Sequence, residues 1–282
     1  MNFLSRLMPR KPEPASPPAA AATVESLPHV ELARENVPDA MGLTDLCKSG
    51  WFEGNELYTG FPITAEDVVV DVGCGNGGYA SFAGRQGAHV VLCDIQPEHL
   101  ARASKVLRET TAREVTEVLT TSEVLPLADG LATRVICTEV LEHVSDPKTM
   151  ISELARITAP GGLLTLTVPH PASEELQKLV APPEYFKPPN HVRIFSVEQF
   201  KSLVTDAGLI IERYDTFGFY SVMLLAFYWG RDTTLEQREH PLLQAWDQTW
   251  RTLFATEGGL ELKRKLDTFL PGTQVIIARK PA

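Results

Sequence analysis

A glycine-rich turn follows directly on an apolar, β-branched run in the first third of the chain. The run Val68-Val69-Val70-Asp71-Val72 is typical of a buried strand, and Gly73, Gly75, Gly77 and Gly78 crowd into the turn after it. A backbone without side chains can approach a ligand closely, and a helix beginning there offers free N–H groups and the positive end of its dipole. The stretch therefore predicts a loop that binds a nucleotide-type cofactor.

The glycine spacing alone leaves two classes of cofactor open. Gly73-x-Gly75-x-x-Gly78 satisfies the dinucleotide pattern, and Asp94 lies about 20 residues on, where the ribose-binding acid of an NAD(P)-dependent oxidoreductase belongs. Asp71 stands two residues before the first glycine. A carboxylate there can face a positively charged amino group, which suits a cofactor that carries an amino acid better than a pyrophosphate.

The elements that must position these residues alternate along the chain. Strands are predicted at 68–72, 89–94, 114–120, 133–138, 163–168, 209–216 and 273–279, and helices at 79–86, 97–110, 147–158 and 197–207. Apolar strands that alternate with helices of this length indicate a parallel sheet covered on both faces. The fold class is therefore doubly wound α/β, Rossmann-like.

The flanking segments differ in composition from this alternation. Residues 1–25 are rich in Pro, Ala and Ser and are predicted to be a disordered tail or linker, with one domain over 26–282. Short helical or irregular pieces are expected between 27 and 61. Prolines between 170 and 190 forbid a long helix and suggest a rim or lid. Residues 217–270 indicate an insertion of two or three helices.

Two further motifs narrow the choice between these two classes of cofactor. Thr138-Glu139-Val140-Leu141-Glu142-His143-Val144 follows the fourth strand, and Ala159-Pro160-Gly161-Gly162 precedes the fifth. With the Asp71–Gly77 loop, they make residues 67–168 resemble the class I S-adenosylmethionine-dependent methyltransferases that act on small molecules. The resemblance implies a seven-stranded sheet whose last strand is antiparallel, with S-adenosyl-L-methionine as cofactor.

The resemblance also implies which residues surround that cofactor. Asp71 would pair with the amino group of the cofactor, and Asp94 would accept hydrogen bonds from both ribose hydroxyls. Thr121 stands where the family often has an acidic residue that contacts adenine. The implied cofactor-binding residues are Asp71, Gly73, Cys74, Gly75, Gly77, Asp94, Ile95, Gln96, Thr121, Ser122, Glu123, Thr138 and Glu139.

A hydroxyl acceptor usually needs a general base, whereas a neutral amine does not. The candidates are His143 and His170, with Glu139 and His191 as alternatives. Glu139 is expected one helical turn before His143 on the same helix face. His170 follows the fifth strand, at the sheet edge where ligands bind in such folds.

The acceptor is predicted from charge and from the insertion. A net charge of -10 argues against a nucleic acid, and no Asn/Asp-Pro-Pro-aromatic motif follows the fourth strand. The insertion opens with the uncharged run 217–229, which is too short to span a bilayer. We therefore expect a small, hydrophobic or lipid-linked acceptor methylated on oxygen, with peripheral membrane contact as a second role for this run.

The cysteines Cys47, Cys74, Cys93 and Cys137 form no CxxC or Cys/His pair with metal-ligand spacing. Buried thiols and a cytoplasmic location are expected, with no metal site. Two other functions remain as alternatives: an NAD(P)-dependent oxidoreductase and a non-catalytic scaffold that keeps the cofactor fold. The sequence does not specify an oligomeric state.

Overall fold

A computed structural model describes residues 54–120, 124–229 and 241–282. The tail predicted at 1–25, Cys47 and the adenine-side residues Thr121, Ser122 and Glu123 lie outside the described residues. So does most of the segment from 27 to 61.

In the described part of the chain, seven strands form one sheet. They are β3 (Val68–Val72), β4 (His89–Asp94), β5 (Glu114–Leu119), β6 (Ala132–Thr138), β7 (Thr158–Pro169), β8 (Ile210–Phe217) and β9 (Thr273–Arg279). The order across the sheet is β5-β4-β3-β6-β7-β9-β8, and β9 runs antiparallel to both of its neighbours. The predicted doubly wound fold with an antiparallel last strand is confirmed.

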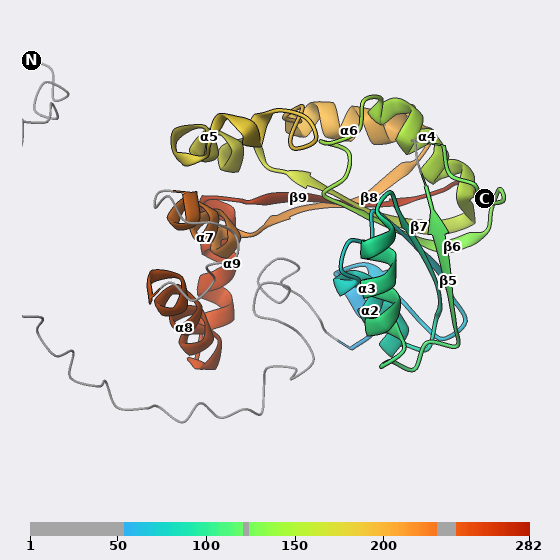
Figure 1. Ribbon diagram of the computed structural model, residues 1–282, viewed down its shortest axis with the longest axis horizontal. Coiled ribbons are helices and arrows are strands. Elements are labelled where there is room, and N and C mark those ends of the chain that lie inside the picture. Colours follow the sequence, from blue (N-terminus) through green and yellow to red (C-terminus); the bar gives the residue numbers. More distant parts are fainter. Residues whose placement is uncertain (1–53, 121–123, 230–240) are drawn as a thin grey trace, which may run out of the picture. The chain divides into compact units, whose positions relative to one another are not determined.

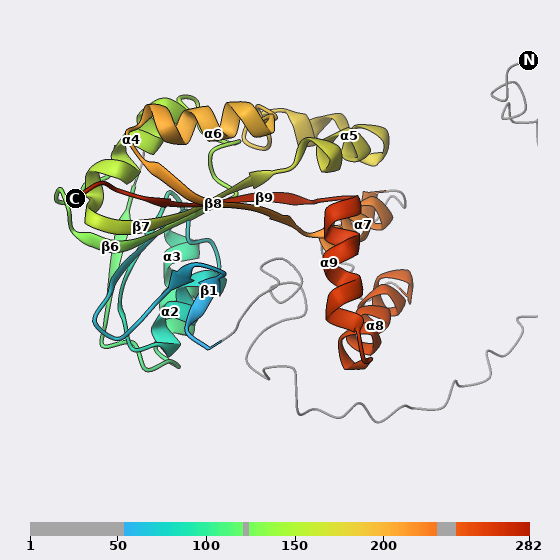
Figure 2. The same ribbon diagram turned by 180° about the vertical axis from the view of Figure 1, so that it is seen from behind.

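Helices cover both faces of this sheet (Figures 1 and 2). α2 (Gly78–Arg85) and α3 (Pro97–Leu107) lie on one face, and α4 (Pro147–Ile157) and α6 (Val197–Asp206) lie on the other. Separate apolar clusters fill the two interfaces, because the central strands bury side chains on both sides. The Ser196 hydroxyl and the Gln199 amide complete a capping box at the start of α6, where the sequence predicts it.

Three segments differ from their predictions. A hairpin of β1 (Glu56–Tyr58) and β2 (Phe61–Pro62) forms at the described end of the segment 27–61, where short helical or irregular pieces were expected, and buries Tyr58 and Phe61 against the sheet. The proline-rich segment contains α5 (Pro171–Val180) and the short 3-10 helix η3 (Pro183–Phe186). α5 forms because Pro171 occupies its first turn, the one helical position where proline costs no hydrogen bond.

Strand β7 begins earlier than expected. It includes Pro160-Gly161-Gly162, which the sequence analysis placed in the turn before the strand. The pairing with β6 is irregular there, and Gly161 has φ +75°. A glycine in that conformation allows a bulge, so the strand continues through the turn residues.

The insertion folds as α7 (Phe219–Trp229), α8 (Pro241–Ala255) and α9 (Gly259–Phe269), beyond the ends of β8 and β9 (Figure 1). Tyr220 and Trp250 are the buried centre of an aromatic cluster that these helices share. One carboxylate oxygen of Asp267 accepts hydrogen bonds from the backbone of Gly218 and Phe219 at the start of α7, and the other pairs with the buried Lys263. No helix among the described residues combines the length and the apolar character needed to cross a membrane.

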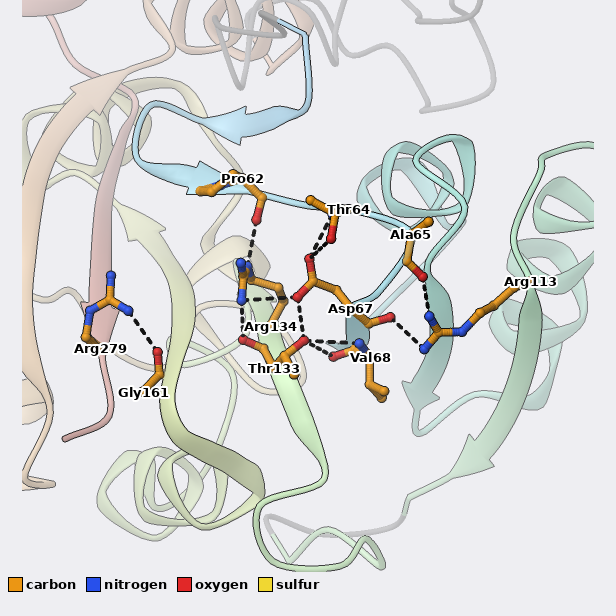
Figure 3. A network of polar contacts seen from close by, with 10 residues as sticks. All are labelled: Pro62, Thr64, Ala65, Asp67, Val68, Arg113, Thr133, Arg134, Gly161 and Arg279. Carbon is orange, nitrogen blue, oxygen red and sulfur yellow. Dashed lines mark hydrogen bonds and ion pairs between the residues drawn. The ribbon is translucent and has the colours of Figure 1, made fainter. Parts of the chain in front are cut away.

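At the amino end of the sheet, Asp67 joins the hairpin to the central strands (Figure 3). Its carboxylate pairs with Arg134 at 3.2 Å and accepts hydrogen bonds from Thr133 Oγ1 at 2.7 Å and Thr64 N at 2.8 Å. Arg134 in turn donates to the Pro62 carbonyl at 2.6 Å. This network holds the sheet at the edge opposite to the candidate site.

Candidate active site

The predicted cofactor residues come together at the carboxyl ends of β3, β4 and β6. Asp71, Asp94 and Thr138 are all buried there. The chain leaves β3 toward β4 and β5 and later returns on the other side of β3 as β6. Ligands bind in open α/β sheets at such a reversal of strand order.

Asp71 is a buried acid with spare hydrogen-bonding capacity. Its side chain is 1% exposed, and its Oδ2 atom has no hydrogen-bond partner among the described residues. A backbone hydrogen bond from Ala80 reaches the carboxylate. Burial, aided by the nearby charge of Asp94, raises the pKa of Asp71 to about 7. A cationic group placed at Oδ2 would favour the ionised carboxylate and so lower the pKa of Asp71 again.

The glycine loop is closed on one side and open on the other. A Cβ atom on Gly73 would lie 2.4 Å from Cγ2 of Val140, so only glycine lets the loop approach the turn after β6. Gly75 has φ +51°, and a Cβ atom there would meet nothing within 4 Å. Gly75 therefore borders open space that a ligand can fill. Burial raises the pKa of the neighbouring Cys74 thiol, which stays neutral.

Asp94 is held in place by three donors. Its Oδ2 accepts from Gly75 N at 2.9 Å, and its Oδ1 accepts from Gln96 N at 2.9 Å and contacts His99 Nδ1 at 3.1 Å. A carboxylate has about four lone-pair sites, so few remain for a ribose diol. If Asp94 is to bind both ribose hydroxyls, one of its three contacts with Gly75, Gln96 or His99 must break.

Apolar side chains lie exposed beside Asp94. Ile95 is 66% exposed and Leu119, at the end of β5, is 50% exposed. Strand pairing places Asp94 opposite Leu119, so the two apolar groups flank the acid. Ile95 was predicted from the sequence and Leu119 was not, although Leu119 is an apolar residue in the last position of an edge strand.

The turn after β6 is not helical, contrary to the expectation for Glu139 and His143. Glu139 has φ +55°, and α4 begins only at Pro147, capped by Asp146. The Thr167 hydroxyl on β7 holds Glu139 from both sides: it accepts from the Glu139 backbone N–H at 3.1 Å and donates to Oε1 at 2.9 Å. A non-glycine residue held at positive φ is characteristic of functional sites.

That turn delivers a cluster of ionisable groups. Glu142 Oε1 lies 3.6 Å from His143 Nε2, and the rings of His143 and His191 meet edge to face at 5.0 Å. Glu174 of α5 holds His191 at 3.1 Å through Nδ1 and accepts from the Tyr185 hydroxyl at 3.3 Å. The cluster joins His143 and His191, two of the histidines that the sequence analysis singled out. It adds Glu142, Glu174 and Tyr185, which that analysis did not select.

The environment of the cluster disfavours charge on several of its groups. Burial, and then the charge of Glu139, raises the pKa of Glu142 well above its usual range. Burial and then the neighbouring His191 lower the pKa of His143. Burial raises the pKa of Tyr185 as well. A neutral imidazole is the form that accepts a proton or binds a metal.

His170 has a different position. Its Nδ1 accepts a hydrogen bond from Ala172 N at 3.1 Å and caps α5, and its own backbone N–H donates to Gly272 at 2.8 Å. Burial lowers its pKa. The geometry accounts for His170 as a helix cap and pairs it with neither of the other two histidines.

The uncharged helix α7 lies next to the ionisable cluster. The ring of Tyr185 contacts Trp229 at the end of α7, with centroids 5.9 Å apart. Three buried polar atoms along α5 and α7 have no hydrogen-bond partner in the described part of the chain: Gln177 Oε1, Ser221 Oγ and Trp229 Nε1. A separate cleft of about 420 Å³ between β8 and α9, lined by Arg213, Arg264 and several threonines, contains none of the predicted site residues.

Two observations test the fit of a cofactor that carries an amino acid and a nucleoside. Asp71 Oδ2 is an orphaned buried acceptor at the strand end, and Gly75 borders open space. A cationic amine would satisfy the first, and the backbone beside the second can contact a ligand directly. The residues present fit such a group.

The comparisons with known proteins point the same way. A family model described as a methyltransferase domain matches residues 5–213. The ubiquinone biosynthesis O-methyltransferase of Xanthomonas oryzae pv. oryzae (strain PXO99A) is 35% identical over 99 residues, which cover 35% of this chain and 41% of that protein. The aligned region thus spans about two fifths of this relative's length.

Solved structures share the fold at lower identity. An S-adenosylmethionine-dependent methyltransferase from Mesorhizobium loti aligns with TM-score 0.50 and 19% identity, over 78% of this chain and 93% of that one. Geranyl diphosphate C-methyltransferase from Streptomyces coelicolor A3(2), in complex with Mg²⁺, geranyl diphosphate and S-adenosyl-L-homocysteine, aligns with TM-score 0.52 and 18% identity, over 77% and 75%. At these identities the likeness establishes the architecture.

Proposed function

The chain belongs to the methyltransferase-domain family, and on that premise we propose that it methylates an oxygen of a small, hydrophobic or lipid-linked acceptor. It is an S-adenosylmethionine-dependent methyltransferase, so the oxidoreductase alternative falls away. We further propose one domain over 26–282 with residues 217–270 as its cap, in a cytoplasmic protein.

The observation that supports this acceptor is the position of the ionisable cluster. Val140 touches the glycine loop at Gly73, and Glu142 and His143 follow two and three residues later in the same turn. On its far side, Tyr185 connects the cluster to the uncharged helix α7. An acceptor whose hydroxyl lies at the cluster and whose apolar part lies along α7 would meet the donor at the end of β6.

Each residue then has a physical task. S-adenosylmethionine supplies an activated methyl group on sulfur when bound. Asp71 holds its amine, Asp94 holds its ribose, and the Gly73–Gly77 backbone lines the methionine part. The cluster binds the acceptor hydroxyl and promotes the loss of its proton, while the packed side chains of α7 keep water out. Alignment in a dry site is the main contribution that a protein makes to such an in-line transfer.

The test uses the full chain and S-adenosylmethionine with a labelled methyl group. A long-chain phenol, the same phenol without its chain, and a long-chain amine are offered as acceptors. We expect label in an aryl ether, with a lower KM for the long-chain phenol. Label found only on the amine would contradict the oxygen assignment, and equal KM values for the two phenols would contradict the role of α7 in binding the apolar part.

A pair of matched variants distinguishes the enzyme from a scaffold of the same fold. Gly75→Arg fills the open space at the loop and should abolish S-adenosylhomocysteine binding and methyl transfer together. Gly208→Arg is the control, because Gly208 also has positive φ and open surroundings but lies after α6, away from the loop. If Gly75→Arg loses binding but keeps the protein's biological role, the scaffold alternative is correct.

A further inference from the structure

Glu142, His143 and His191 each present a possible metal-ligand atom, and these atoms all lie within 4.8 Å of one another. Glu142 Oε1 and His143 Nε2 are already 3.6 Å apart. Ligands about 2.0–2.1 Å from a tetrahedral zinc ion are separated by roughly 3.3 Å, so this pair needs little adjustment.

The second nitrogen of each imidazole has an oxygen partner. His143 Nδ1 lies 3.1 Å from the Pro189 carbonyl, and His191 Nδ1 lies 3.1 Å from Glu174 Oε2. Both partners are acceptors, so both Nδ1 atoms carry the proton and both Nε2 lone pairs remain for a ligand. Metal-binding histidines are oriented in this way, by a carbonyl or a carboxylate at the other ring nitrogen.

Glu142 supplies the independent observation. Its side chain is fully buried, and neither carboxylate oxygen has a hydrogen-bond partner among the described residues. A buried carboxylate without donors is costly unless a cation or a proton compensates it. The ring nitrogen 3.6 Å from its Oε1 atom carries no proton to donate in the tautomer that pairs His143 Nδ1 with the Pro189 carbonyl.

We propose that Glu142, His143 and His191 bind a divalent transition-metal ion of the zinc class. Two imidazoles and one carboxylate suit zinc and its neighbours, whereas magnesium and calcium prefer oxygen-only ligands. Three protein ligands leave a coordination position open, as in catalytic zinc sites. His143 is the most exposed of the three, so the ion can enter from solvent on that side.

This site deepens the proposed function, on which the following step rests. The acceptor hydroxyl occupies the open position, and the ion lowers its pKa so that its proton leaves to solvent. The oxygen then attacks the methyl carbon, the O–CH₃ bond forms, and the S–CH₃ bond breaks with its electron pair returning to sulfur. An alkoxide or phenolate bound to the ion would need no separate general base.

No metal site was predicted from the sequence because the four cysteines, the usual signal, have no metal-ligand spacing. Glu142 and His143 are neighbours, but His191 lies far along the chain, beyond α5 and η3. The segment between Pro189 and Val192 returns to the turn after β6, where Val192 N donates to the Glu142 carbonyl at 3.0 Å. This contact brings His191, the third proposed ligand, next to Glu142 and His143.

The test measures metal binding without cofactor or acceptor, so that its failure is separable from failure of the proposed function. Chelator-treated, full-length protein is titrated with Zn²⁺ alone by calorimetry, and with Co²⁺ alone by visible absorption. We expect one ion per chain and Co²⁺ bands typical of four- or five-coordinate sites. If the wild-type protein shows no saturable binding of Zn²⁺ or Co²⁺, the proposal is overturned.

Variants assign the ligands. Glu142→Gln and His191→Asn should each weaken Zn²⁺ affinity by more than about 100-fold, and Glu174→Gln, which only orients His191, by about 10–100-fold. His89→Asn is the control, because His89 lies at the amino end of β4 and contacts Thr116. Circular dichroism and S-adenosylhomocysteine binding establish that each variant is folded. Unchanged Zn²⁺ affinity in folded Glu142→Gln and His191→Asn would place the ion elsewhere and refute the site.

Discussion

Asp71 is a residue whose burial lowers the stability of the folded protein at neutral pH. Its pKa is about 7 in the folded protein and 3.8 as a free side chain. Between these pH values the unfolded chain loses the proton first, so stability falls as pH rises through this window and is constant above it. At 1.36 kcal/mol per pKa unit, the full cost is about 4 kcal/mol.

Asp71→Asn should therefore stabilise the protein, and more at pH 8 than at pH 5. We expect a gain of up to about 4 kcal/mol at pH 8 and less than half of that at pH 5, measured by urea unfolding. The same variant should lose most of its affinity for S-adenosylhomocysteine, because the amide cannot neutralise the amine. An equal stability change at both pH values would mean that Asp71 is ionised throughout.

The residues proposed to bind the methyl donor could be selected from the sequence because they are close together along the chain. Asp71, Gly73 and Gly75 lie within one strand and its following turn, where residue type and spacing carry the information. The residues of the proposed acceptor side could not all be selected in this way. Glu174 and His191 meet only through the folding of α5 and η3, and the buried state of Glu142 depends on packing from several elements.

At the scale of elements, the Asp67–Arg134 pair fastens the β1–β2 hairpin to β3 and β6. Asp67 is 6% exposed and the Arg134 side chain is 18% exposed, so removal of Asp67 leaves a partly buried guanidinium without its carboxylate. Breaking a buried pair from one side is far more costly than losing a surface pair.

Asp67→Ala should destabilise the protein by about 3–5 kcal/mol in chemical unfolding. Glu175→Ala is the matched control, because Glu175 pairs with Lys178 on the exposed face of α5 and should cost less than about 0.5 kcal/mol. A loss below about 1 kcal/mol for Asp67→Ala would mean that solvent reaches Arg134 easily.

Elements with strong local signals were predicted almost to the residue. β9 matches its predicted bounds, and the capping box fixed the start of α6. The hairpin before β3 and the helix α5 were missed because both depend on tertiary contacts: Tyr58 packs on Phe217, and Gln177 hydrogen-bonds to the Val222 carbonyl. The helical reading of the turn after β6 failed because Glu139 is held at positive φ by Thr167.

At the scale of the whole described fold, α7, α8 and α9 share an aromatic centre separate from the clusters on the two faces of the sheet. Trp250 and Tyr220 are each 1% exposed, and their rings meet edge to face with centroids 5.5 Å apart. Separate packing predicts separate stability, because local opening follows local contacts.

Trp250→Ala should remove about 3–5 kcal/mol from this cluster. We expect faster hydrogen exchange in α7–α9, unchanged exchange in β3 and β4, a raised KM for the acceptor and an unchanged Kd for S-adenosylhomocysteine. Phe269→Ala is the control, since Phe269 is 81% exposed on α9 and its loss should cost less than about 0.5 kcal/mol. A weakened Kd for S-adenosylhomocysteine would mean that the two regions fold as one unit.

The insertion leaves the sheet after β8 and rejoins it before β9, and the chain segments at these two points are in contact. Gly272 N donates to the Phe217 carbonyl at 2.8 Å, and a Cβ atom on Gly272 would lie 2.7 Å from the Gly218 oxygen. Because the two ends are already joined, residues 219–271 can be lengthened, shortened or replaced without breaking a ladder bond of β8 or β9. An exchange of this segment would therefore leave the carboxyl ends of β3, β4 and β6, and the residues gathered there, in place.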